Sequence, residues 1–229
     1  MRLAALYRVA RDNFTRLPSR YKVRGKSVAV SGMRSDRVSP IVVAAALSAC
    51  AFEPEALNSE RIENRFGSCG IEVLTHVAGV RRTSLFSSHG AQKICRTYAV
   101  VQFEDESTSR VADAHAEVLA GHSIGATFKS TGWEIRKVTL HVGQLSAVAP
   151  SHPIGALMHL EQVTDLGMHA YQLVLEKDSQ SINYATIVET HHPDYLTVEE
   201  LNSLYGKDVE SRLSENDFNK LFALVLSAD

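Results

Sequence analysis

Apolar residues alternate with polar ones or run together in six short stretches, and these stretches predict the strands of the chain. Each is rich in β-branched and aromatic residues and is bounded by turn residues, which is the pattern of a strand. The predicted strands cover residues 71–76, 80–87, 93–103, 134–142, 170–176 and 182–190. The turn residues Ser88-His89-Gly90, between the second and third stretches, predict a hairpin.

Helical patterns and capping residues predict helices around these strands. Asn58 or Ser59 is a candidate cap for a helix that ends near Phe66, and Thr197-x-x-Glu200 has the form of a capping box. Other helices are predicted over residues 3–14, after 40, over 110–120 and after 214, with a loop and a short helix within 146–167. Helices inserted between the strands of a mostly antiparallel sheet give an α+β fold.

Charge is distributed unevenly along the chain. Residues 1–37 carry ten Lys and Arg against two Asp, a balance of +8, and the net charge of -2 therefore leaves -10 for the remainder. A basic start with few acidic residues is typical of an extension that docks on an acidic protein partner, or of an organelle transit peptide. We therefore expect a basic helical extension over residues 1–56, a central domain over 57–196 and a C-terminal helical extension over 197–229.

Composition excludes several classes of protein. The 229 residues are 45% hydrophobic and 22% charged, as in an ordinary globular domain, and the net charge of -2 argues against a general nucleic-acid binder. Three cysteines without a CxxC pair favour a reducing compartment, so we expect a cytoplasmic location unless the basic start directs import. No apolar run approaches eighteen residues, so no membrane span is predicted, and the run over 41–52 fits a buried helix.

Arginines on two neighbouring strands form the first candidate site. Arg96 lies in the middle of the apolar third strand, and Arg81 and Arg82 begin the second. A three-residue loop that pairs Ser87 with Ala91 sets Arg82 opposite Arg96, and two adjacent guanidinium groups repel each other unless an anion lies between them. The pair predicts a carboxylate-binding site, with Arg81 as the alternative to Arg82. The competing interpretation is that the arginines lie on a solvated sheet face.

A carboxylate closes the last predicted strand. Glu189 ends an apolar run, and Pro193 follows, where a missing N–H stops the pairing. In the same cavity as the arginines, Glu189 is a candidate acid or hydrogen-bond acceptor. His191 and His192 are a candidate metal pair, but adjacent residues of a strand point to opposite faces, so we expect no metal site.

The order of these pieces resembles the chorismate lyases (chorismate pyruvate-lyases), whose fold is shared with the UTRA effector-binding domains. In that family the returning hairpin strand carries an arginine, as Arg96-Thr97-Tyr98-Ala99-Val100 does here, and the last strand ends in a glutamate four residues before a proline, as Glu189 does. A family Pro-Leu-Gly segment corresponds to Ser123-Ile124-Gly125, and a strand of the form Arg-Asp-x-Ile-x-Ile corresponds to residues 134–140. The resemblance covers about residues 57–196.

This resemblance implies a site and an activity. The implied catalytic residues are Arg82, Arg96 and Glu189, and the implied substrate-binding residues are Arg81, Ile62, Ile124 and Gly125. The implied activity is that of a cofactor-independent lyase of aromatic biosynthesis, which releases pyruvate from chorismate or a close cyclohexadienyl carboxylate and leaves a hydroxybenzoate. Two arginines would bind the carboxylates and stabilise the departing enolpyruvate. A non-catalytic module of the same fold that binds small carboxylates, and a hotdog-type thioesterase, are the alternatives.

Overall fold

The computed structural model describes residues 56–207, 209 and 214–226, which all belong to the second of two compact units, residues 52–229. The helices predicted over residues 3–14 and after residue 40, and nearly all of the basic extension, lie outside the described residues. None of the described helices is both long and apolar enough to cross a membrane.

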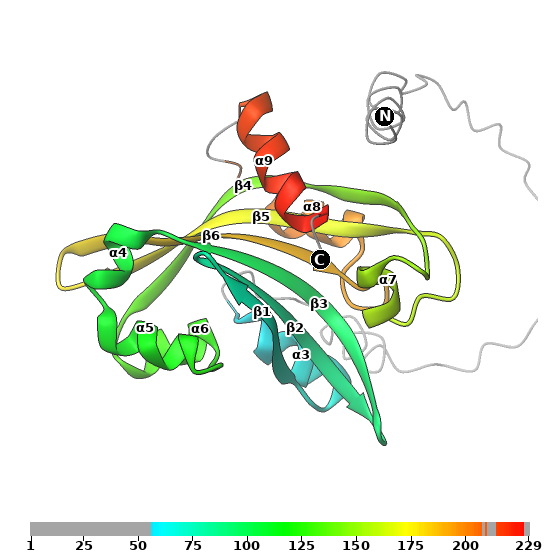
Figure 1. Cartoon of the computed structure of the whole chain (residues 1–229), viewed down its shortest axis with the longest axis horizontal. Helices are drawn as coiled ribbons and strands as arrows, with labels where there is room; N and C mark the ends of the chain where they lie inside the picture. The colour runs from blue at the N-terminus through cyan, green and yellow to red at the C-terminus, as the bar shows by residue number, and fades with distance from the viewer. Residues whose placement is uncertain (1–55, 208, 210–213, 227–229) are drawn as a thin grey trace, which may run out of the picture. The chain divides into compact units, whose positions relative to one another are not determined.

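Six antiparallel strands form one sheet in the described part of the chain, in the order β1-β2-β3-β6-β5-β4 (Figure 1). The strands are β1 Gly70–Val77, β2 Val80–His89, β3 Gln92–Phe103, β4 Glu134–Val148, β5 Thr164–Lys177 and β6 Gln180–His191. Two groups of three consecutive strands meet where β6 pairs with β3, so the middle of the sheet joins segments far apart in the sequence. The prediction of an α+β fold with a mostly antiparallel sheet is confirmed.

The helices connect these strands or follow the last one. Those in the described residues are α3 Asn58–Phe66, α4 Asp105–Ser109, α5 Ala112–Leu119, α6 Ile124–Ser130, α7 Pro153–Leu157, α8 Val198–Tyr205 and α9 Glu215–Leu226. As predicted, Thr197 caps α8 in a capping box with Glu200, and α9 begins directly after Ser214. The segment 146–167 contains the short helix α7 between the ends of β4 and β5, which run further than predicted.

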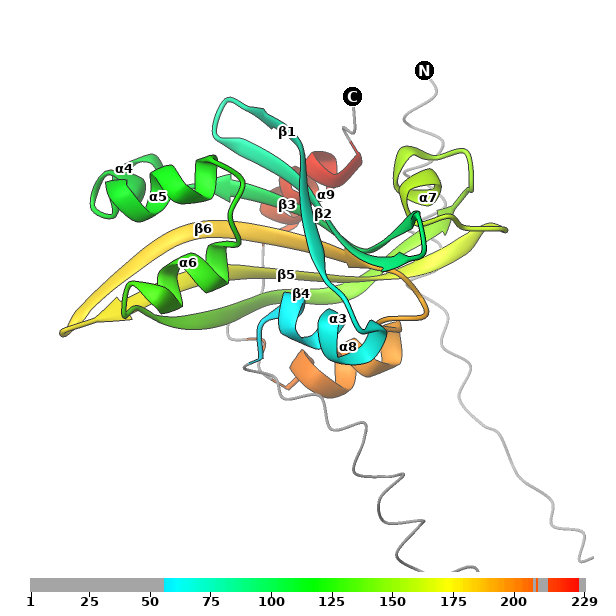
Figure 2. The same ribbon diagram turned by 90° about the horizontal axis from the view of Figure 1, so that it is seen from below.

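Neighbouring residues of β3 pack on opposite faces of the sheet. Val100 belongs to a core cluster with Ile154 of α7 and Val225 of α9. Val101 belongs to a second cluster with Val118 of α5 and Phe128 of α6. Figure 1 shows α9 above the sheet and α3, α5 and α6 below it, and Figure 2 shows α3 and α6 on one side with α9 on the other. The face that carries α3 and α6 holds the cavity described below.

The β2–β3 hairpin differs from its predicted register. Its loop has two residues, Gly90 and Ala91, and His89 pairs with Gln92. Gly90 has a φ of 60°, which suits the first position of a type II′ turn. Because the loop lies further along the chain than predicted and an irregularity follows Leu85, Arg82 pairs with Val100, four residues from Arg96.

Candidate functional site

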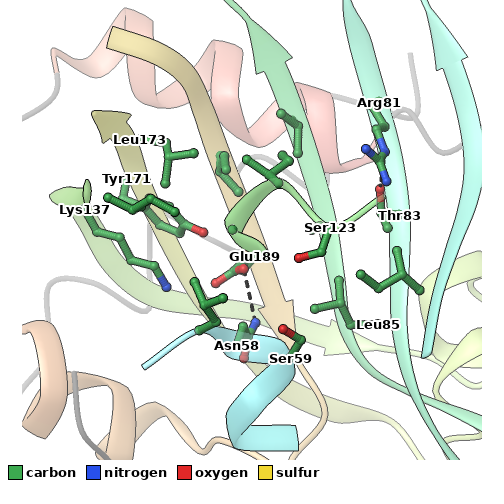
Figure 3. A pocket seen from close by; sticks show the side chains of 18 residues that line it. Asn58, Ser59, Arg81, Thr83, Leu85, Ser123, Lys137, Tyr171, Leu173 and Glu189 are labelled. Atoms are coloured by element: carbon green, nitrogen blue, oxygen red, sulfur yellow. Dashed lines mark hydrogen bonds between the residues drawn. The ribbon is translucent and has the colours of Figure 1, made fainter. Parts of the chain in front are cut away.

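A cavity of about 90 Å³ lies beneath the first turns of α3 and α6 (Figure 3). A single water needs roughly 10–15 Å³ of such volume, so the cavity has room for a small molecule with one ring. Its walls are mostly apolar, and its polar or charged lining residues are Asn58, Ser59, Arg81, Thr83, Ser123, Lys137, Tyr171 and Glu189.

Glu189 lies on the central strand β6 with its carboxylate in this cavity. Only 6% of the residue is exposed, and its Oε1 accepts a hydrogen bond of 3.1 Å from Nδ2 of Asn58. Burial alone would raise the pKa of Glu189, but the charges of Lys137, His191 and Arg61, with the Asn58 bond, outweigh burial and lower that pKa. Glu189 is therefore a carboxylate at neutral pH, and it can accept a hydrogen bond from a ligand.

Asn58 joins α3 to the floor of the cavity. The sequence suggested it as a helix cap, but Leu57 is the N-cap residue and the Asn58 side chain points inward. Its Nδ2 donates to Thr97 Oγ1 at 3.1 Å as well as to Glu189, and its Oδ1 accepts from the hydroxyl of Tyr195. A buried amide that is satisfied at both ends fixes the position of the first turn of α3.

Lys137 is the functional candidate that the sequence reasoning missed. It lies on β4, its Nζ is closed off from solvent, and that Nζ has no hydrogen-bond partner among the described residues. Its Nζ lies over the Tyr171 ring, 4.9 Å from the ring centroid. Burial lowers the pKa of Lys137 to about 8. Figure 3 shows its side chain and that of Glu189 reaching into the same region of the cavity from different strands.

The alternation of inward and outward positions along β4 places Lys137 on the face that points toward the cavity. Ile135 also lines the cavity, and Thr139 is buried. Since side chains two residues apart share a face of a strand, Lys137 lies between two inward positions, whereas Arg136 is exposed.

Arg81 is the hairpin arginine that reaches the cavity lining, and most of its donors are occupied by protein. Its Nε donates to Thr83 Oγ1 at 3.1 Å, and Nη1 donates to the carbonyl of Val118 at 2.7 Å. Nη1 and Nη2 each lie 3.4 Å from the carbonyl of His122. These carbonyls are at and beyond the C-terminal end of α5, where a cation is favourable. Arg81 therefore positions α5 relative to β2.

Arg82 faces away from the cavity. It is adjacent to Arg81 on β2, so its side chain leaves the opposite face of the sheet, where its charge and a hydrogen bond act to lower the pKa of Tyr98 against the larger effect of burial. Its partner on β3, Val100, packs on the same face in the core cluster with Ile154 of α7.

Arg96 is buried, with 7% exposed, but it does not line the cavity. It lies at the irregularity in β3, where its Nε donates to Ser87 Oγ at 2.9 Å. Its guanidinium carbon is 3.9 Å from the Phe66 ring centroid, and its Nη1 is 3.7 Å from Asp194. Arg96 thus anchors the end of α3 and the chain after β6, and it does not form a clamp with Arg82.

Of the three residues without a charge that the resemblance implies for substrate binding, two line the cavity and one does not. Ile124 and Gly125 line the cavity. A Cβ on Gly125 would lie 2.5 Å from Leu57 Cδ2, so a residue without a side chain allows α6 to approach the start of α3. Ile62 is fully buried in a cluster with Tyr195 and is not a lining residue.

The two histidines after Glu189 have separate surroundings. His191 Nδ1 is 3.0 Å from Thr97 Oγ1, and burial lowers the pKa of His191 to about 4, so it is neutral at pH 7. His192 Nδ1 instead accepts a hydrogen bond of 3.0 Å from the backbone N–H of Asp194. Among the described residues, no group of three or more His, Cys, Asp or Glu side chains is arranged to hold a metal ion.

No protein-family model matches this chain, and no curated protein is significantly similar to it in sequence.

Proposed function

We propose that this domain binds a small organic carboxylate in the cavity beneath α3 and α6, with Lys137 as its counter-charge. The observation that carries this proposal is the closed-off Nζ of Lys137, which has no hydrogen-bond partner among the described residues. A buried ammonium without a hydrogen-bond acceptor is costly, and the charge of Glu189 and the Tyr171 ring compensate for only part of the lost hydration. A ligand carboxylate supplies the missing acceptor once the flexible end of the lysine turns toward the cavity.

The cavity also limits the size and polarity of the ligand. Its volume of about 90 Å³ suits one ring, and apolar side chains such as Ile124, Ile135 and Leu173 suit the faces of that ring. The hydroxyls of Ser59 and Ser123 offer further hydrogen bonds at the wall under the two helices. A benzoate or a cyclohexadienyl carboxylate has these properties.

Glu189 selects among such ligands. Its lowered pKa leaves it ionised, so it accepts a hydrogen bond from a hydroxyl or amine and repels a second carboxylate. A hydroxybenzoate therefore fits this site better than a dianion such as chorismate. Arg96 lies outside the cavity lining, and the donors of Arg81 are largely occupied by protein groups. A chorismate lyase would need two arginines to bind the substrate carboxylates, so we propose ligand binding in preference to lyase activity.

Thermal unfolding with a panel of ligands tests the proposal. Benzoate, 3-hydroxybenzoate and 4-hydroxybenzoate should raise the melting temperature, because a ligand that binds only the folded state stabilises it by about 2.7 kcal/mol at a hundredfold excess over Kd. Cyclohexanol, which has a ring but no carboxylate, should give no shift. A parallel assay measures the release of pyruvate from chorismate. Turnover in that assay would favour the lyase over the binding module.

Two variants test whether the shift in melting temperature depends on Lys137. Lys137→Met removes the ammonium and keeps most of the apolar stem, so it should abolish the shift. Lys177→Met removes a charge from the exposed end of β5 and should leave the shift unchanged. Equal shifts in both variants, or no shift in the wild-type protein with any carboxylate, would contradict the proposal.

A further inference from the structure

An apolar run ending in a cysteine lies just ahead of the folded domain, and the proposed ligand site does not account for it. Residues 41–47 read Ile-Val-Val-Ala-Ala-Ala-Leu, and Ser48, Ala49 and Cys50 follow. Arg34 and Arg37 precede the run. A basic segment, an apolar segment of 7–15 residues and then small residues is the pattern of a secretory leader. A run too short to span a membrane as a mature helix has a suitable length for the apolar part of such a leader.

The cysteine is the informative member of this pattern. An ordinary leader is cut after small residues whatever follows them, whereas leucine, two small residues and then cysteine is the arrangement recognised by the enzymes that attach lipid to secreted bacterial proteins. The chain has three cysteines, and only Cys50 has this context. Cys69 is half-buried immediately before β1, and Cys95 is 1% exposed within the core on β3.

The domain boundary agrees with cleavage at this point. The chain divides into compact units between Ala51 and Phe52, one residue beyond Cys50. The first described helix, α3, begins at Asn58, and the described hydrogen bonds reach back only to the carbonyl of Ala56. A cut before Cys50 therefore removes no residue of the described sheet, of its helices or of the cavity.

We infer that Cys50 is a lipid-modification site and that the mature protein is a lipoprotein beginning at this residue. The Cys50 sulfur displaces the phosphate from the diacylglyceryl carbon of a phosphatidylglycerol-type lipid. A thioether bond forms, the carbon–oxygen bond to phosphate breaks, and glycerol phosphate leaves with the thiol proton. Water then hydrolyses the peptide bond between Ala49 and Cys50. The diacylglyceryl group anchors the domain to a membrane outside the cytoplasm, where the cavity meets the solutes of that compartment.

This inference changes the interpretation of the basic N-terminal segment and of the cysteines. The positive charges before residue 41 belong to a leader that is removed, in place of a surface that docks an acidic protein. The expected cytoplasmic location rested on an odd number of cysteines, but once Cys50 is a thioether only two thiols remain.

Metabolic labelling of the full chain tests the inference. Residues 1–229 with a C-terminal tag are expressed in a bacterium that processes lipoproteins, with an alkyne-bearing fatty acid in the medium. The purified protein should carry the label, partition with membranes and show an intact mass without residues 1–49 but with a diacylglyceryl group. An inhibitor of the lipoprotein signal peptidase should leave the leader attached.

Cysteine variants show which residue carries the lipid. Cys50→Ser should lose the label completely and keep residues 1–49, while its melting curve stays that of the wild-type domain. Cys69→Ser, the matched control, should be labelled and cut like the wild type. An unlabelled wild-type protein, label retained in Cys50→Ser, or a cut at any other bond would overturn the inference.

Discussion

The side-chain amide of Asn58 donates a hydrogen bond of 3.1 Å to the carboxylate of Glu189, and this bond joins the first turn of α3 to the central strand β6. The two residues are 131 positions apart in the chain. The helix that covers the cavity is therefore held by the same carboxylate that we propose to contact the ligand, so the stability of α3 and the polarity of the site are coupled.

Asn58→Ala should destabilise the domain. The variant removes the amide hydrogen bonds to Thr97, to Glu189 and from the hydroxyl of Tyr195. A buried hydrogen bond between neutral groups contributes about 0.5–1.5 kcal/mol, and one to a charged group about 1.5–3 kcal/mol. Denaturant unfolding measures the loss, for which we expect about 2–4 kcal/mol. Ser59→Ala, one residue further along α3, should stay within about 0.5 kcal/mol of the wild type. Equal losses in both variants would show that the helix turn, and not the bond, sets the stability.

Arg81→Lys should loosen α5 although it keeps the charge. The guanidinium reaches Thr83 and the carbonyls of Val118 and His122 at once, and a lysine ammonium cannot reproduce this fork. Amide hydrogen exchange over residues 112–130 should become faster by about tenfold or more, which corresponds to about 1.4 kcal/mol of local stability. The exposed Arg110→Lys is the control and should leave the exchange unchanged.

The hydrophobic pattern identified all six strands of the described sheet. Five of these strands have buried residues, and the edge strand β1 contributes the partly buried Leu74 to the core. The register of β2 with β3 depended on a single turn, because the loop at Gly90 could have two residues or three. Together with the irregularity after Leu85, that choice moved the β3 partner of Arg82 by four residues, from Arg96 to Val100. The face that Arg82 occupies is set by its place next to Arg81 on β2. A register set by one turn residue is hard to read from sequence, because both loops accept glycine.

The site was harder to predict than the strands. Arg96 was expected to be buried, and it is, but the anion expected beside it is replaced by Ser87, Phe66 and Asp194 of the same chain. Lys137 lies in a strand that mixes charged, polar and apolar residues, and a charged side chain in such a strand is expected at the surface. Its burial depends on the covering helices α3 and α6, which come from other parts of the sequence.

Lys137 should give the folded protein a distinct alkaline pH dependence. Burial lowers its pKa from 10.5 to about 8, so between these values the unfolded chain holds a proton that the folded protein has lost. The free energy of unfolding therefore rises with pH across this window, by up to about 3 kcal/mol for a shift of this size. Lys137→Met should flatten the rise between pH 8 and 9.5, and Lys177→Met should keep it. An identical slope in all three proteins would place the Lys137 ammonium in contact with water.

His191 should make the domain sensitive to acid. Its pKa is lowered by burial from 6.5 to about 4, so the unfolded chain takes up a proton first as the pH falls. The free energy of unfolding should fall between pH 6.5 and 4, by up to about 3 kcal/mol from this residue. His191→Gln, which keeps a hydrogen-bonding group near Thr97, should lose part of this dependence, whereas the exposed His122→Gln should retain it. Chemical denaturation at several pH values measures both.

Glu189→Gln tests the proposed choice of ligand. The substitution keeps the shape and an acceptor for the Asn58 amide, but it removes the negative charge. A hydroxybenzoate should lose about 10- to 100-fold in affinity relative to benzoate, since a hydrogen bond to a charged group contributes about 1.5–3 kcal/mol. Benzoate itself should bind as well as before or better, because the variant no longer repels its carboxylate. Calorimetric titration of both ligands gives the ratio.

The matched control for this variant is Glu176→Gln, which removes a carboxylate from the partly exposed ion pair with Arg136 on the same sheet. It should leave the ratio of the two affinities unchanged. If Glu189→Gln also leaves the ratio unchanged, the carboxylate does not contact the ligand hydroxyl. Should wild-type protein release pyruvate from chorismate and Glu189→Gln reduce that rate by about 10²–10⁴, Glu189 acts as an acid–base group and the domain is a lyase, not a binding module.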